Sequence, residues 1–93
     1  MATAEVFGPY EQWSMVLVYD RRTGGIVHAH QEVTAPGGTH PDATTMETKA
    51  AGYAAQAKQL PPETLACLQI DPRQIDYGAQ YTVDVTNRSL RKA

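Results

Sequence analysis

The sequence predicts a single α+β domain of two layers, in which one helix covers one face of a four-stranded antiparallel sheet. Three observations support this fold. Residues 13–19, WSMVLVY, are rich in β-branched and aromatic side chains; residues 44–60 carry small and apolar side chains at helical spacing; and residues 80–86 alternate apolar with polar side chains. The expected order is β-β-α-β-β over residues 12–93, preceded by an N-terminal arm, residues 1–11.

The first predicted strand, residues 13–19, is apolar on both of its faces. Trp13, Met15, Leu17 and Tyr19 alternate along one face, and Val16 and Val18 along the other. A strand that is apolar on both faces is typical of the centre of a sheet. We therefore expect it to be central, with the strands in the spatial order 2-1-3-4.

An antiparallel hairpin joins this strand to the second one. Residues 20–25, DRRTGG, place an aspartate and two glycines where a tight turn needs them, and residues 26–33 continue as a strand. Its side chains fall into two sets: Ile26, His28, His30 and Glu32 on one face, and Val27, Ala29, Gln31 and Val33 on the other. We expect the histidine-bearing face to be the less buried of the two.

The helix follows a connection rich in glycine and proline, residues 34–42. Thr44 stands three residues before Glu47, which is the capping-box spacing, and Asp42 is a competing N-cap. The expected apolar stripe consists of Met46, Ala50, Tyr53, Ala57 and Leu60, with Ala54 at or near it. Its alanines should let the helix lie close to the sheet, and Pro61-Pro62 should end it.

Two further strands complete the predicted sheet. Residues 65–71 are expected as the third strand, residues 72–78 as a turn, and residues 80–86 as the fourth strand, with Tyr81, Val83 and Val85 facing inward. Residues 87–93 are expected to turn back briefly or to fray.

The second apolar face of the first strand predicts self-association, most simply as a dimer. One helix covers only one face of a sheet, and monomers rarely expose a large contiguous apolar patch. The expected interface consists of Trp13, Met15, Leu17 and Tyr19. The competing interpretation is that the arm folds over this face within the same chain.

Composition and charge exclude several classes of function. Eight basic and ten acidic side chains give a net charge of −2 without long runs, which argues against nucleic-acid binding. The single cysteine, Cys67, excludes an intrachain disulfide and is expected to be a buried, inert thiol. No segment resembles a signal peptide or approaches the about 20 apolar residues that cross a bilayer. We therefore expect a cytoplasmic protein that does not bind membranes.

The spacing of His28 and His30 raises the alternative of a metal site. Two imidazoles two positions apart on a strand point the same way, about 6.5–7 Å apart, and can share one ion. His40 or Glu32 could supply a third ligand, and water on the metal could then support hydrolytic or lyase chemistry. We favour a polar strand face instead, because His40 lies in a connection that gives it no reason to converge on the pair.

Other residues do not form a recognisable catalytic pattern. Ser14 has no base at a suggestive spacing, and Asp71, Asp76 and Asp84 form no carboxylate pair. The sequence therefore predicts a small non-enzymatic interaction or assembly domain, without a cofactor, that self-associates or docks a partner through its sheet. The alternatives are a metal-dependent enzyme or metal-binding protein that uses the His-x-His motif, and a small-molecule-binding module with an aromatic cleft between sheet and helix.

Overall fold

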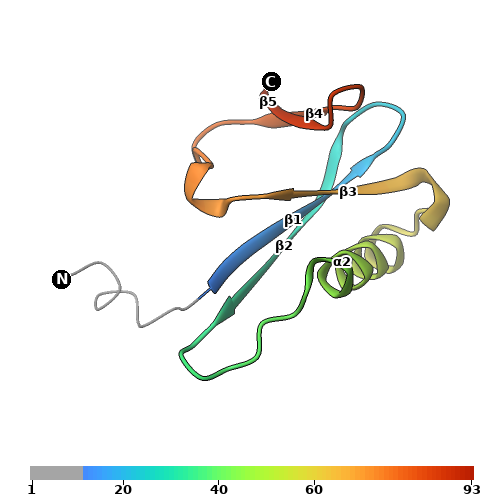
Figure 1. Cartoon of the computed structure of the whole chain (residues 1–93). Coiled ribbons are helices and arrows are strands. Elements are labelled where there is room, and N and C mark those ends of the chain that lie inside the picture. Colours follow the sequence, from blue (N-terminus) through green and yellow to red (C-terminus); the bar gives the residue numbers. More distant parts are fainter. Residues whose placement is uncertain (1–11) are drawn as a thin grey trace.

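A three-stranded antiparallel sheet forms the middle layer of the fold (Figure 1). The computed structural model describes residues 12–93, and the predicted arm, residues 1–11, lies outside the described residues. The elements in chain order are β1 (Gln12–Asp20), β2 (Ile26–Thr34), α2 (Ala43–Lys58), η1 (Pro62–Thr64), β3 (Leu65–Ile70), η2 (Pro72–Gln74), β4 (Tyr81–Asp84) and β5 (Ser89–Lys92). None of the helices described between residues 12 and 93 has both the length and the hydropathy of a membrane-spanning segment.

β1 is the central strand, as its two apolar faces predicted. It pairs with β2 on one side and with β3 on the other, antiparallel to both. On one face, Val16 and Val18 are fully buried in the core beneath α2. On the opposite face, three side chains are also buried within the chain, namely Met15, Leu17 and Tyr19, with exposed fractions of 4%, 5% and 3%. Both faces of β1 are therefore covered without a second chain.

The predicted strand order 2-1-3-4 is wrong at its last strand. β4 does not extend the sheet beside β3 but pairs with β5 in a separate two-stranded sheet. Residues 71–80 carry the chain from the end of β3 to the face opposite α2, and residues 89–92, part of the segment expected to turn back or fray, form β5. A fourth strand beside β3 would have left the second face of β1 in water, whereas the β4–β5 hairpin and residues 71–80 cover it.

The turn between β1 and β2 holds the β4–β5 hairpin in place. The carbonyl of Gly24 accepts hydrogen bonds from the backbone N–H of Val83, at 2.9 Å, and from the hydroxyl of Thr82, at 3.0 Å. Gly24 has a φ of +83°, and a Cβ at this position would collide with the carbonyl of Val83. Because glycine alone combines this conformation with so close an approach, the residue joins the two sheets.

A bulge at the start of β2 changes which side chains share a face. Val18 pairs with His28, whereas Tyr19 pairs with Ile26, so Val27 has no partner in β1. Ile26 therefore lies with the side chains that face away from α2, and Val27 packs against the core beneath the helix. The prediction that Ile26 shares a face with His28 is wrong, because a strict two-residue alternation does not allow for an extra residue.

α2 begins at the competing cap. The carboxylate of Asp42 accepts a hydrogen bond from the backbone N–H of Thr45, at 2.7 Å, so Thr44 does not act as the N-cap. At the other end, Gln59 adopts a left-handed conformation with a φ of 55°, and two prolines follow shortly after it. The predicted end of the helix is therefore confirmed.

The buried side of α2 follows positions that are four residues apart. Met46, Ala50 and Ala54 are buried, the two alanines completely. Tyr53 is 52% exposed and Ala57 is also exposed, so the expected stripe is wrong at these two positions, whereas Leu60 packs against the core as expected. Ala54 faces the sheet in place of Tyr53 because its small side chain lets the helix lie close to the valines of β1.

Replacing Ala54 with leucine should overpack this contact and destabilise the fold by about 1–3 kcal/mol. The matched control is Ala57→Leu, which places the same side chain on the exposed side of α2 and should change the stability by less than about 0.5 kcal/mol. Urea denaturation of the two variants measures both effects. Equal losses of stability would contradict this orientation of the helix.

Candidate functional site

A row of polar side chains lies along β2 on the side of the sheet that α2 covers. It consists of His28, His30, Glu32 and Thr34, all of them partly buried. The side chains that alternate with them, those of Ala29, Gln31 and Val33, are exposed. The expectation that the histidine-bearing face is the less buried one is therefore wrong, because α2 lies over this face of the sheet. We call these four residues the polar row.

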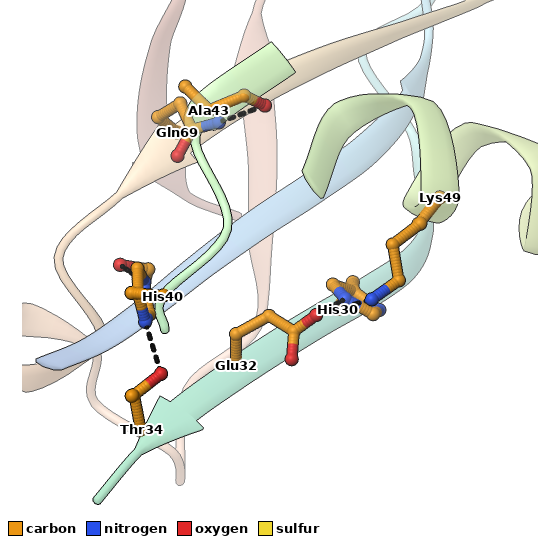
Figure 2. A network of polar contacts seen from close by, with 8 residues as sticks. His30, Glu32, Thr34, His40, Ala43, Lys49 and Gln69 are labelled. Carbon is orange, nitrogen blue, oxygen red and sulfur yellow. Dashed lines mark hydrogen bonds and ion pairs between the residues drawn. The ribbon is translucent and has the colours of Figure 1, made fainter. Parts of the chain in front are cut away.

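Within the polar row, Glu32 bonds to two basic side chains (Figure 2). Its Oε1 accepts a hydrogen bond from Lys49 Nζ of α2, at 2.8 Å, and one from His30 Nε2, at 3.2 Å. The bond from Lys49, followed by that from His30, lowers the pKa of the Glu32 carboxyl, and the carboxylate in turn raises the pKa of Lys49. Glu32 and Lys49 therefore balance each other's charge beside β2.

Tyr53 of α2 lies against the two histidines. Its ring centroid is 6.5 Å from that of His28 and 5.9 Å from that of His30, and the two imidazole centroids are 6.5 Å apart. Burial lowers the pKa of His28, and the nearby charges of His30 and Lys58 lower it further. Both effects favour the neutral form of the His28 imidazole.

His40 joins the far end of the polar row to β1. Its Nδ1 lies 2.6 Å from the hydroxyl of Thr34 (Figure 2), and its Nε2 lies 2.9 Å from the hydroxyl of Ser14. Sequence spacing suggested no base for Ser14, because the two residues are 26 positions apart and only the fold brings them together. A serine beside an imidazole is the pair used in nucleophilic catalysis, but here the second ring nitrogen meets a hydroxyl rather than a carboxylate. His40 therefore links residues 35–42 to the sheet through these two hydrogen bonds.

The three histidines proposed as metal ligands do not converge. His28 and His30 are neighbours, but His40 bonds to Thr34, which lies four positions beyond His30, about 13 Å along the strand. Within residues 12–93, no group of three or more histidine, cysteine, aspartate or glutamate side chains has the geometry to hold a metal ion.

The expected interface residues lie largely inside the chain. Met15, Leu17 and Tyr19 are buried, and Trp13 is half-buried at the end of the sheet. The indole N–H of Trp13 donates to the side-chain oxygen of Gln31 at 2.7 Å, and the guanidinium of Arg73 lies 5.6 Å from the centre of the indole ring.

A small open pocket of about 190 Å³ lies between the sheet and the segment that follows β3. The sequence predicted a cleft between the sheet and the helix, whereas this pocket is on the opposite face. Its lining includes Leu17 and Ile26 from the sheet, and Asp76, Tyr77 and Tyr81 from the C-terminal segment. Their polar atoms already bond within the chain: Tyr77 to a carbonyl, Tyr81 to a backbone N–H, and Asp76 to a backbone N–H and a lysine.

The outer edge of β2 has no strand beside it within residues 12–93. There, β2 pairs with β1 alone. We call the unpaired side of residues 28–34 the β2 edge.

At the opposite edge of the sheet, the guanidinium of Arg88 donates to the carbonyl of Cys67 in β3, at 2.8 Å. The Cys67 thiol is half-buried and lies 3.7 Å from a helix carbonyl, and burial raises its pKa.

Comparisons with known proteins do not assign this site to a family. No family model, no curated protein and no solved structure matches the chain. The functional proposal therefore rests on the geometry of the chain itself.

Replacing His40 with alanine should destabilise the fold by about 1–3 kcal/mol, because two hydrogen bonds between the 35–42 connection and the sheet are lost. Thr39→Ala, at the exposed neighbouring position, is the matched control and should change the stability by less than about 0.5 kcal/mol. Thermal or urea unfolding measures both. If the two variants lose the same stability, His40 does not fasten this connection.

Zinc should barely change the melting temperature of the protein, because the histidines do not provide three converging ligands. A metal present at 100 times its dissociation constant would add about 2.7 kcal/mol, a shift of roughly 10 °C or more for a domain of this size. Calorimetry with and without zinc measures the effect, and the double variant His28→Gln with His30→Gln is the control. A large shift that this variant abolishes would show that the histidines bind metal.

Proposed function

We propose that this chain is a non-enzymatic interaction domain that docks a protein partner through its sheet, by accepting a further strand along the β2 edge. The observation that carries the proposal is that β2, nine residues long, is paired on one side only within the described residues. In an antiparallel strand, alternate residues direct their N–H and C=O groups away from the paired neighbour. Such a row of free groups is the template that strand-addition complexes use.

The side chains of the β2 edge support this use. Natural edge strands are commonly protected by lysine or proline, and residues 28–34, HAHQEVT, contain neither. The exposed side carries the uncharged residues Ala29, Gln31 and Val33, the last of them 51% exposed. On the covered side, Lys49 balances the charge of Glu32. An incoming strand would therefore meet no uncompensated charge.

The burial of the opposite sheet face favours the edge over the face as the docking surface. We expected docking through the side chains of β1 that face away from α2. Met15, Leu17 and Tyr19 are covered by the chain itself, so a partner could reach them only by displacing the C-terminal segment. Among residues 12–93, no element has to move for a strand to reach the β2 edge.

The two alternative functions have less support. A metal-dependent function needs ligands that converge, and His40 is directed to Ser14 and Thr34 instead. Small-molecule sites use a few free polar groups to orient their ligand. In the pocket, the side-chain polar atoms of Asp76, Tyr77 and Tyr81 are already bonded within the chain.

Selection of peptides from a random 12-residue library displayed on phage tests strand addition directly. We expect enriched peptides that bind the native chain and that bind the double variant Ala29→Lys with Val33→Lys at least about tenfold more weakly, a difference of about 1.4 kcal/mol. The reason is that lysines on the exposed side of β2 protect the edge, as they do in natural sheets.

The matched control for this test is Thr48→Lys with Gly52→Lys, which adds the same charge at exposed positions of α2; a Cβ at Gly52 meets only open space. This variant should bind the enriched peptides like the native chain. The proposal would be contradicted if the library yields no binders, or if the selected peptides bind both lysine variants with the same affinity.

A further inference from the structure

We infer that the strand accepted by the β2 edge is β2 of a second copy of this chain, antiparallel to the first, with the twofold axis at Gln31. This inference rests on the proposed function and names its partner. Its premise is the pattern of side chains along residues 28–34, which complements itself when the strand is reversed. A twofold interface of this kind brings the same surface of both copies together and closes on itself.

The axis at Gln31 is chosen by the shape of β2. The bulge at Val27 interrupts the regular strand at one end, and Thr34 ends it at the other. A strand that pairs with its own copy about Gln31 places residue 28 opposite residue 34 of the second copy, so the whole regular segment is paired. An axis at position 29 or 30 would force the bulge into the interface and leave part of the regular segment unpaired.

On the side of the sheet that α2 covers, the register about Gln31 places groups that can hydrogen-bond to each other in opposite positions. His30 of each copy lies opposite Glu32 of the other, about 4.5–5.5 Å apart between Cβ atoms. Within each copy, Glu32 accepts hydrogen bonds from Lys49 and from its own His30. Because a carboxylate can accept several hydrogen bonds, each His30 can exchange its bond to its own Glu32 for a bond to Glu32 of the second copy. His28 of each copy lies opposite the Thr34 hydroxyl of the other.

On the exposed side, the same register brings uncharged side chains together. Ala29 of each copy faces Val33 of the other, and the two Gln31 side chains face each other at the axis. Val33, which is 51% exposed in the single chain, thereby gains an apolar neighbour. Two copies thus bury their exposed edge side chains against each other without placing like charges opposite one another.

The helices leave room for this pairing. α2 packs on all three strands of its sheet. Pairing of two β2 strands places the two copies of β1 three strand spacings apart, about 14 Å, which exceeds the 8–10 Å of directly packed helices. Tyr53, 52% exposed and lying above β2, would line the space between the two helices. The dimer would then have one continuous six-stranded sheet with both helices on the same face.

Disulfide crosslinking tests both the dimer and its register, in a Cys67→Ser background that removes the native thiol. Gln31→Cys should form a covalent dimer under mild oxidation, because directly opposed residues of an antiparallel pair have the Cα separation that a disulfide needs. Val33→Cys is the control: its two copies would be four residues apart along the strands, about 13 Å, beyond the reach of a disulfide. Mixing Val33→Cys protein with Ala29→Cys protein should restore the crosslink, because these two positions face each other.

The outcomes separate this inference from the proposed function. Light scattering of the native chain over a concentration series should show a dimer, and thermal unfolding of the reduced variants checks that they fold. A native chain that stays monomeric, with no crosslink through Gln31→Cys, overturns the second copy as partner, while selected peptides that still bind the β2 edge leave the proposed function standing. Crosslinking of Val33→Cys as fast as that of Gln31→Cys overturns the register.

Discussion

The fold depends on one constraint, which is that β1 is apolar on both faces and must be buried on both. Val16 and Val18 need a cover on one side, and Met15, Leu17 and Tyr19 need one on the other. Each large apolar side chain that is removed from water stabilises the fold by roughly 1.5–3 kcal/mol. In a small domain this is a large share of the available stability. The helix meets the first need, and the β4–β5 hairpin with the segment before it meets the second.

This division of the chain explains why β2 has no second neighbouring strand within residues 12–93. With α2 on one face and the C-terminal segment on the other, residues 12–93 place no further element beside β2. The turn at Gly24 is hydrogen-bonded to β4, and Arg88 from the β4–β5 hairpin is hydrogen-bonded to β3. The lack of a second neighbour for β2 within these residues is therefore a consequence of covering β1, and the proposed function depends on it.

The polar row shows how a partly buried strand face can carry titratable groups. α2 lies above it and supplies Lys49, which compensates the charge of Glu32, and Tyr53, which covers the imidazoles. His40 closes the far end through two hydroxyl groups. The histidine pattern that raised the metal alternative thus belongs to the packing between helix and sheet, because the third histidine is held elsewhere by its own hydrogen bonds.

The sequence by itself determined the elements whose cause is local: β1 as the central strand, the hairpin to β2, one helix that ends before Pro61, and β3 antiparallel to β1. These follow from side-chain periodicity and from turn and breaker residues, which act over a few positions. Only the tertiary structure decided where β4 lies, which side of α2 is buried beyond Ala50, that Val27 forms a bulge, and that Ser14 meets His40. The alternation of Tyr81 and Val83 predicts a strand with one buried face, but it does not specify what buries that face. A sequence pattern predicts that a side chain is buried. Which residues it packs against depends on the surfaces that remain uncovered once the whole chain has folded.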